Sequence, residues 1–494
     1  MSQFTEADSA VNRLSAAVTA FEKVLTEPEG TVVEMPVGAV QPSLAERLKR
    51  AIDAVTVKPA QAAAQATAAA QQAQTAQQAA AQSATDAANS AAATGYVDAP
   101  FPDVWAPLSD DLRLLAGFAP PDKSMTFTRS TTARYIDKSG VLKTAAINEP
   151  RFEREGLLIE GQSTNYVLNS DDPTQWQSNS TLTKASIVDG TTQAITYTGT
   201  VNAATSANHQ ATVSSNISVN AGDTVTISAR AKASSDIVRF RFTLDGTDIA
   251  NIFFNAITGE FISATAGLTY TTALGSDGYA YLTATYTAPS AGVVSAGVWL
   301  RGNANLTVGT VIYIQMLQVE KNPVATSYIP TGSSAVTRAG DFLEISPLGN
   351  VGYRLVGDSF ARSLAFEITV NRFVNPTVGY VDVLANWGAK NDIILRFTGN
   401  TARAYRSSSG PTISNVTFPL SSKIYAQTID TYNNNEVANY FDGKSSSTMS
   451  GGPVDPSSAG TALRFQGNSN IVHHIRNFRI WHRLLTPIQI KGLR

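Results

Sequence analysis

The sequence predicts a mainly β fold, in which an N-terminal helical coiled-coil stalk is followed by a small β-hairpin connector and two tandem antiparallel β-sandwiches. Residues 1–95 have apolar side chains at helical spacing and then a run of alanine and glutamine. Later residues form short β-branched or aromatic runs bounded by Gly, Asp, Asn or Pro. A length of 494 residues suits about three domains, which favours a stalk with separate β-domains over one globule.

The amino-acid composition excludes or disfavours several classes of function. Lys and Arg number 37 against 39 Asp and Glu, and charged residues make up 15% of the chain, where about 25% is usual. This balance disfavours a nucleic-acid-binding protein, which needs a positive face. The lack of cysteine excludes disulfides, thiolate metal sites and a cysteine nucleophile. No secretory signal and no run of 18 apolar residues occur, so we expect synthesis in the cytoplasm and no membrane insertion.

Residues 1–58 are expected to form two helices, the first of which carries an apolar stripe. The stripe residues occupy the a and d positions of a heptad pattern and are Phe4, Val11, Leu14, Val18, Phe21 and Leu25. Pro28 and Gly30 break this helix. Ser43 and Glu46 form a capping-box pattern that opens the second helix. An isolated helix would expose the stripe to water, so we expect it to meet a partner helix, most simply from another copy of the chain.

Residues 59–95 are expected to form a helical shaft. Residues 60–93 contain 19 alanines in 34 positions, and alanine has the highest helix propensity. The small side chains would let identical chains pack closely. A flexible Ala/Gln linker is the alternative.

The β-part is expected in three segments. Residues 96–160 form a connector, in which the turn Asp137–Gly140 between two β-branched or aromatic runs predicts a hairpin. Residues 161–332 and residues 333–494 each contain a series of short strands separated by turns. Each series is typical of an antiparallel β-sandwich.

Several motifs in the β-part resemble proteins of bacteriophage tails. A module that recurs in phage tail fibres and appendages resembles the connector at residues 101–105, 127–130, 135–140 and 156–160. The carbohydrate-binding-module-like jelly roll of phage tail proteins resembles the first sandwich at residues 164–170, 318–331 and 337–339. The closing strands of concanavalin or laminin-G-like sandwiches are similar to residues 440–444 and 475–486.

The resemblance implies a homotrimeric fibre or appendage of a virion, assembled in the host cytoplasm. Its N-terminus would attach to a tail, portal or collar protein of the virion. Its two jelly-roll-type sandwiches would bind the surface polysaccharide of the host bacterium during adsorption, without catalysis. Two alternatives stay open, namely a purely structural appendage without glycan binding and a polysaccharide depolymerase or esterase.

Glycan contacts are expected on loops of the last sandwich, because sugar rings pack their apolar sides on exposed aromatic faces. Trp387 ends a predicted strand, and Tyr405 and Arg406 precede a Ser/Gly-rich loop. We predict that these three residues bind glycan. The remaining tryptophans of the sandwiches are expected in the cores and are Trp176, Trp299 and Trp481.

We assign no catalytic residue, metal ligand or cofactor. The string Gly357–Phe360 is similar to the nucleophile block of GDS-type esterases, but no histidine of the chain follows an aspartate by three residues. No spacing pairs the candidate acids Glu153, Glu155, Glu160, Asp171, Asp172, Glu320 and Glu344. The acidic segments 171–172 and 245–248 are interpreted as turns rather than calcium sites. His473 and His474 should point to opposite faces of a strand.

Overall fold

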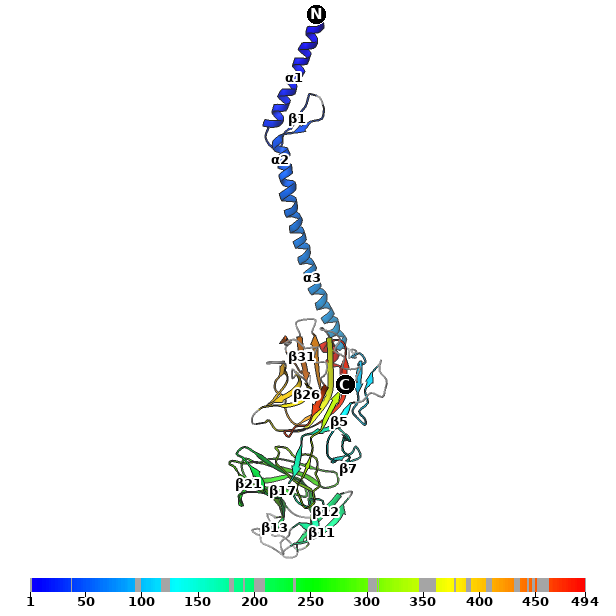
Figure 1. The fold of residues 1–494 in the computed structure, drawn as a ribbon, viewed down its shortest axis with the longest axis vertical. Coiled ribbons are helices and arrows are strands. Elements are labelled where there is room, and N and C mark those ends of the chain that lie inside the picture. The colour runs from blue at the N-terminus through cyan, green and yellow to red at the C-terminus, as the bar shows by residue number, and fades with distance from the viewer. Residues whose placement is uncertain are drawn as a thin grey trace. The chain divides into compact units, whose positions relative to one another are not determined.

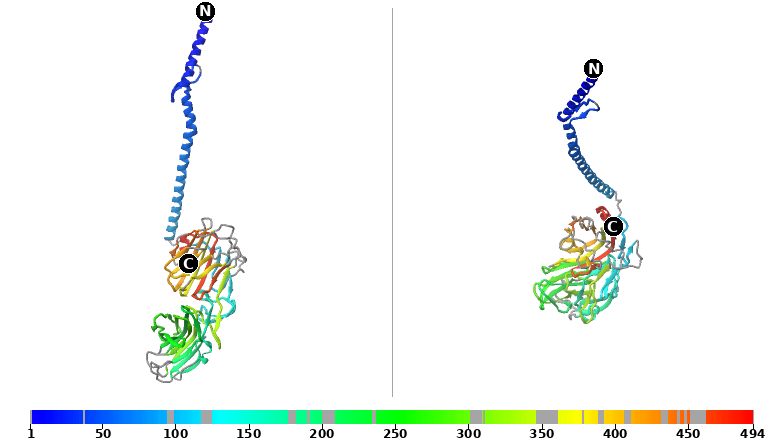
Figure 2. Two further views of the ribbon diagram at one scale, coloured as in Figure 1. Left: turned by 60° about the vertical axis from the view of Figure 1, so that its left-hand side comes forward. Right: turned by 45° about the horizontal axis from the view of Figure 1, so that its top comes forward.

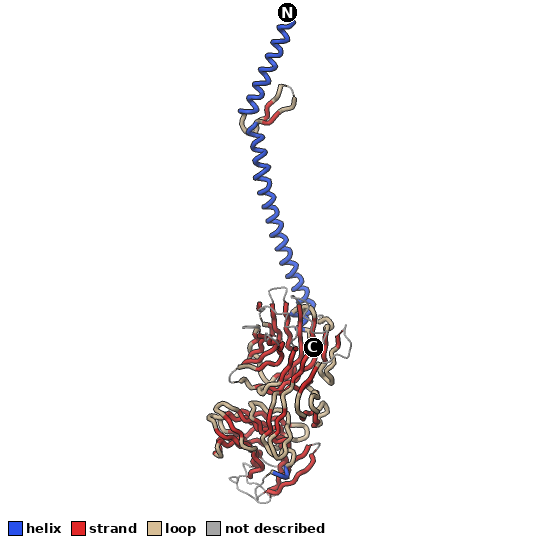
Figure 3. Tube along the Cα trace, in the orientation of Figure 1, coloured by secondary structure: helices blue, strands red, loops and turns tan. Residues whose placement is uncertain are grey.

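The computed structural model divides the chain into two compact units, Met1–Val97 and Asp98–Arg494 (Figure 1). It describes all residues except Met1, Val37, Arg494 and the ranges 94–98, 117–124, 177–181, 190–191, 200–208, 234–236, 301–308, 310, 346–360, 377–378, 388–391, 406–410, 431–435, 442–443, 447–448 and 451–461. Within the described residues the first unit is mostly helical and the second is mostly strands (Figure 3). The predicted mainly β class is thus confirmed.

The first unit begins with helix α1 (Ser2–Thr26), followed by a hairpin of β1 (Val32–Val33) and β2 (Gln41–Pro42). Next come α2 (Leu44–Ile52), the π-helical segment η1 (Asp53–Val57) and α3 (Lys58–Ala93), which Figure 2 shows as one helical column. The Ala/Gln segment is therefore helical over residues 59–93. No helix among the described residues is long and apolar enough to cross a membrane.

The predicted capping box at the start of α2 is only half formed. Ser43 Oγ accepts the Glu46 backbone N–H at 3.1 Å, as a cap should. The Glu46 carboxylate instead accepts the backbone N–H of Gly30 at 3.0 Å. This bond ties the end of the α1 segment to the start of α2.

The first sandwich consists of two antiparallel sheets around one core. One sheet has the order β11 (Leu182–Asp189), β12 (Thr192–Gly199), β22 (Val311–Glu320), β15 (Thr224–Ala233), β20 (Ala280–Thr287) and β19 (Thr269–Leu274). The other has β13 (His209–Val213), β21 (Gly292–Leu300), β16 (Ile237–Leu244), β17 (Thr247–Asn255) and β18 (Phe261–Ala264), with β14 (Ile217–Val219) beside β21. Inward side chains such as Ile227, Phe240 and Leu282 fill the core. A short 3₁₀ turn, η2 (Pro173–Gln175), precedes β11.

The second sandwich also has two antiparallel sheets. One contains β29 (Thr412–Ile413), β28 (Thr401–Tyr405), β27 (Asp392–Thr398), β26 (Val381–Trp387), β34 (Ala462–Gln466), β24 (Phe342–Ile345) and β5 (Thr126–Thr128). The other contains β32 (Lys444–Ser445), β31 (Glu436–Phe441), β30 (Leu420–Asp430), β25 (Ala361–Phe373), β35 (Ile471–Trp481), β3 (Val104–Ala106) and β4 (Leu115–Ala116). Beside these lie β33 (Met449–Ser450), β9 (Gly156–Glu160) and β8 (Phe152–Glu153), and helix α4 (Pro487–Lys491) ends the chain.

The segment expected to be a separate connector, residues 96–160, supplies strands to this second sandwich. β5 pairs with β24, and β3 and β9 pair with the edge of β35 that β25 leaves open. Val104, Phe127 and Leu157 lie in the same core as Leu343 and Phe478. The boundary predicted at residue 160 therefore does not separate the sheets, because an unpaired edge of β35 and these apolar side chains both require partners.

The first sandwich is consequently an insertion between β9 and β24 of the second. Its two connections pair as β10 (Ser163–Asn165) and β23 (Val336–Arg338), with Ser163 opposite Arg338. We call this pair and the flanking residues 160–162 and 339–341 the neck. The predicted hairpin forms from β6 (Ala133–Ile136) and β7 (Leu142–Ala145).

Candidate functional site

A cleft of about 380 Å³ lies on the outer face of the first sandwich, over β15, β20 and β22. Alternate residues of these strands, such as Ile227 and Leu282, point into the core, so their neighbours Ser228 and Tyr281 lie on the outer face. The second sandwich closes the cleft with residues of β25 and β35, and the hairpin β6–β7 lines it as well.

One wall of this cleft combines a tyrosine with guanidinium groups. The Arg372 guanidinium of β25 lies over the Tyr281 ring of β20, 5.0 Å from the ring centroid. Arg372 also donates a hydrogen bond to the Ala325 carbonyl. Arg230 of β15 forms an ion pair with Asp277. These contacts fix the orientation of the Tyr281 ring and of the Arg372 and Arg230 guanidinium groups before any ligand is bound.

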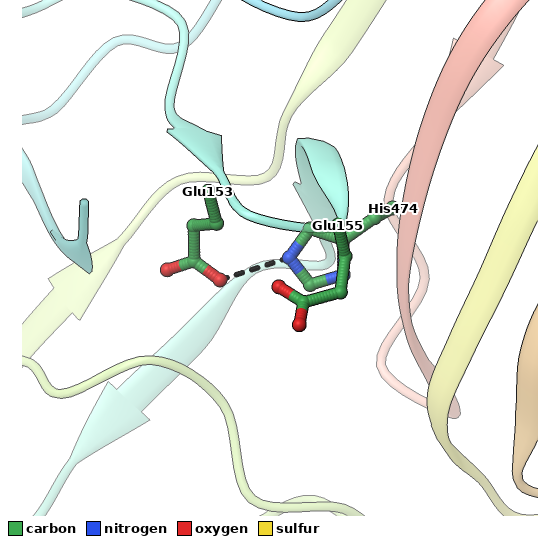
Figure 4. A group of neighbouring side chains, drawn as sticks. All are labelled: Glu153, Glu155 and His474. Atoms are coloured by element: carbon green, nitrogen blue, oxygen red, sulfur yellow. Dashed lines mark hydrogen bonds and ion pairs between the residues drawn. The ribbon is translucent and has the colours of Figure 1, made fainter. Parts of the chain in front are cut away.

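Two carboxylates lie beside a histidine, and of these three residues Glu153 and His474 line the cleft (Figure 4). His474 Nε2 lies 2.8 Å from Glu153 Oε2, and His474 Nδ1 lies 2.7 Å from the side-chain oxygen of Asn371. The Glu155 carboxylate lies beside this pair, and one ligand atom from each of the three acidic and imidazole groups falls within 4.8 Å of the others. His474 is buried, whereas Glu153 is partly exposed.

A buried ionic cluster at the neck fixes the floor of the cleft. Arg151 forms ion pairs with Glu160 at 2.8 Å and with Asp341 at 2.5 Å, and all three side chains are almost completely buried. Ser327, on the segment after β22, donates to Glu160 from its backbone N–H and its hydroxyl. Burial alone raises the pKa of Glu160, but the guanidinium groups of Arg338 and Arg151 and the Ser327 hydrogen bonds hold that pKa far below its usual value. The cluster thus joins the two sandwiches through charges that water does not reach.

The chemistry of the cleft suits a hydroxyl-rich ligand with flat apolar faces. Tyrosine rings offer apolar surfaces, and guanidinium and carboxylate groups offer paired donors and acceptors. The tyrosines and charged side chains that line the cleft are Arg134, Tyr135, Glu153, Glu160, Arg230, Asp277, Tyr281, Tyr328, Arg372 and His474. The volume is that of a small-ligand pocket.

The stripe on α1 is exposed in the single chain. Its described side chains, Val11, Leu14, Val18, Phe21 and Leu25, are between 49% and 66% exposed. Phe4 lies in α1, but its side chain is outside the described residues. Five large apolar groups on one helix face are a surface that a partner helix would cover.

The side chains of the three predicted glycan contacts lie outside the described residues. Trp387 is the last residue of β26 and Tyr405 is the last residue of β28, and the side chains of both lie outside the description. Arg406 lies outside it entirely, as does the string Gly357–Phe360. These assignments stay predictions. Trp176, Trp299 and Trp481 are all buried. Trp176 packs in the core of the first sandwich and Trp481 in a smaller cluster with Leu485, whereas Trp299 lies under the Arg241 guanidinium on the face of β21 opposite to Val298.

The acidic turns behave as the sequence indicated. Asp245 and Gly246 both have positive φ in the tight turn from β16 to β17, and Asp248 pairs with Arg239 and Arg241. Asp172 accepts the backbone N–H of Thr174 in a local turn. The Asp172 and Asp248 carboxylates therefore already have hydrogen-bond or ion-pair partners within the protein.

The sequence missed the grouping of Glu153, Glu155 and His474. The acids and the histidine are more than 300 residues apart, so no local spacing could pair them. His473 does point away from His474, as expected for neighbours on a strand, and it is buried with no hydrogen-bond partner among the described residues. Burial lowers the pKa of His473 to about 3, so this ring is neutral.

Comparison with known proteins gives little further guidance. No protein-family model and no curated protein matches the chain. The binding domain of Paraclostridial Mosquitocidal Protein 1 is a solved structure with a TM-score of 0.23 and 11% identity; the match covers 31% of this chain and 43% of that chain. The CBM22-1-CBM22-2 tandem domain of Paenibacillus barcinonensis Xyn10C gives a TM-score of 0.20 and 10% identity, over 65% of this chain and 98% of that chain. Likenesses of this size assign this chain to no family.

Proposed function

We propose that this chain is the adsorption protein of a phage tail fibre or appendage, a homotrimer that binds bacterial surface polysaccharide without cleaving it. The N-terminal unit joins the three chains and attaches to the virion, and the β-unit binds the glycan. The cleft over β15, β20 and β22 carries the proposal.

Sugar recognition needs both kinds of group that the cleft brings together. The Tyr281 ring provides an apolar face, and Arg372 and Asp277 provide groups that bind vicinal hydroxyls in pairs. Contacts within the protein already orient all three side chains, which lowers the entropy lost on binding. An isolated site of this kind binds weakly.

Trimerisation compensates for the weak binding of glycan by a single cleft. The exposed stripe on α1 provides a surface on which three chains can associate. Three clefts that act on one polysaccharide convert later binding events into intramolecular ones, which raises avidity by about 10²- to 10⁴-fold.

The test is adsorption of labelled full-length protein to candidate host cells, with and without their surface polysaccharide. We expect binding that is lost from stripped cells and that falls about tenfold in Tyr281→Ala, which corresponds to about 1.4 kcal/mol. Tyr270→Ala is the control, because Tyr270 is an exposed tyrosine of the same sandwich that stacks on Phe261 outside the cleft.

Each contrary outcome has a definite meaning. Binding that survives removal of the polysaccharide, or that Tyr281→Ala leaves unchanged, contradicts a glycan site in the cleft. Release of reducing ends or acetate from the polysaccharide contradicts the absence of catalysis.

A further inference from the structure

We propose that Glu153, Glu155 and His474 bind one divalent transition-metal ion beside the cleft, which Glu153 and His474 also line. This site is independent of the proposed function, because its ligands and its test require no glycan. The three side chains come from β8, from the turn after β8 and from β35. Figure 4 shows the Glu153 carboxylate joined by a dashed line to a nitrogen of the imidazole and the Glu155 side chain overlapping the ring in this view.

The β8–β9 hairpin brings the carboxylates to the histidine. β9 pairs with β35 so that Leu158 lies opposite His474, and β8 pairs back on β9. Gly156 forms the close contact in this turn, with a φ of +126°. A Cβ at Gly156 would lie 2.5 Å from the Ile475 carbonyl oxygen, so only glycine lets the turn lie this close to β35.

The surroundings of the imidazole suit the tautomer that a metal requires. The side-chain oxygen of Asn371 lies 2.7 Å from His474 Nδ1 and can accept a hydrogen bond from a proton that Nδ1 carries, and in that tautomer the lone pair is on Nε2. Nε2 lies 2.8 Å from Glu153 Oε2, and in the same tautomer these two acceptors require a cation between them. A metal-binding histidine commonly has a carbonyl or carboxylate partner on its other nitrogen, and Asn371 takes that role here.

Glu153 is oriented for the same position. One of its oxygens, Oε1, accepts the Ile136 backbone N–H at 2.9 Å, and this leaves Oε2 directed at His474. Glu155 is 40% exposed and can turn toward the site without leaving a core position. The ion pair between Glu155 and the 86% exposed Arg154 is 4.0 Å long and weak.

The donor atoms and their spacing select the class of ion. Metal–ligand bonds of about 2.0–2.2 Å place neighbouring ligand atoms about 3 Å apart. The ligand atoms of Glu153 and His474 already lie at about this spacing. The Glu155 carboxylate oxygen lies within 4.8 Å of them, so it must move by about 2 Å at most to reach a spacing of about 3 Å. One imidazole nitrogen with two carboxylates suits Zn²⁺, Mn²⁺ or Co²⁺, whereas Ca²⁺ prefers six to eight oxygens. Glu153 and His474 also line the cleft, so water or a ligand hydroxyl in the cleft can complete the coordination of the ion.

The experiment is a titration of metal-free full-length protein with Co²⁺, followed by visible absorption, and with Zn²⁺, followed by calorimetry. We expect one Co²⁺ per chain, displaced by Zn²⁺, and much weaker binding of Ca²⁺ and Mg²⁺. Glu155→Gln and His474→Gln should each weaken Co²⁺ binding at least tenfold, and Asn371→Ala about 10- to 100-fold. His482→Gln, a surface histidine after β35, is the control and should bind as the unmodified chain does.

The proposal is overturned if the unmodified chain binds no Co²⁺, since Glu153 and His474 then form an ordinary ion pair. It is also overturned if Glu155→Gln binds Co²⁺ as tightly as the unmodified chain, or if Ca²⁺ competes equally with Co²⁺. Glu155→Gln changes an exposed side chain without a change of size, so its result does not depend on whether His474→Gln folds.

Discussion

Arg151 and Asp341, 190 residues apart in the chain, are joined by a hydrogen bond of 2.5 Å from Nη2 to Oδ2, and both side chains are fully buried. Arg151 precedes β8 and Asp341 precedes β24, so the bond closes the neck on both sides of the inserted sandwich. Arg129 adds a second guanidinium to the same carboxylate at 3.3 Å. Because water does not reach these charged side chains, each one is stabilised by its oppositely charged partners in the cluster.

Arg151→Met is therefore expected to destabilise the β-unit strongly. It leaves Glu160 and Asp341 without a shared cation, and loss of one partner from a buried ion pair costs about 3–5 kcal/mol. The measurement is urea unfolding followed by tryptophan fluorescence. Arg154→Met, on the same hairpin but 86% exposed, is the control and should cost less than about 0.5 kcal/mol. Equal losses in the two variants would disprove the role of the cluster.

Acid should weaken the same cluster through Glu160. A carboxyl whose folded-state pKa is lowered stabilises the fold above its unfolded pKa of about 4.3, and the contribution is lost as pH falls below that value. The difference in unfolding free energy between the unmodified chain and Glu160→Gln should be nearly constant from about pH 7 to pH 5.5 and should shrink below about pH 4.5. Urea unfolding at about pH 7, 5.5, 4.5 and 3.5 measures it. A difference that grows in acid contradicts the prediction.

The α1 stripe should hold three chains together. Val18→Asp places a charge in the middle of the stripe and is expected to convert the full-length trimer into single chains at micromolar concentration, as measured by light scattering. Asn12→Asp adds a charge at a position next to the stripe, on the polar side, and should leave the trimer intact. A single-chain mass for the unmodified protein would refute trimerisation.

Trp387 and Tyr405 provide a second test of glycan binding. If the strand ends that carry them contact polysaccharide, Trp387→Ala and Tyr405→Ala should each lower adsorption about tenfold, a loss comparable to one aromatic contact. The loss should add to that of Tyr281→Ala, because residues without shared partners act independently. Adsorption unchanged in both single variants would confine recognition to the cleft.

The local parts of the structure could be predicted from the sequence. The helical stripe from Val11 to Leu25 follows from a period of 3.6 residues, and the Ala/Gln helix follows from the high helix propensity of alanine. The hairpin at Asp137–Gly140 follows from turn chemistry that is equally local. These predictions required no knowledge of which segment lies next to which.

Tertiary structure alone decided the rest. β9 and β3 pair with β35, more than 300 residues later, because that strand has an unpaired edge, and this makes the first sandwich an insertion. The pairing of β9 with β35 places Glu153 and Glu155 beside His474. The packing of the two sandwiches sets Arg372 over Tyr281. Such contacts depend on the strand register between distant segments, and a single sequence contains no local period that reveals this register. The sequence by itself therefore determined the stalk and the individual strands, and the way the strands assemble determined the cleft.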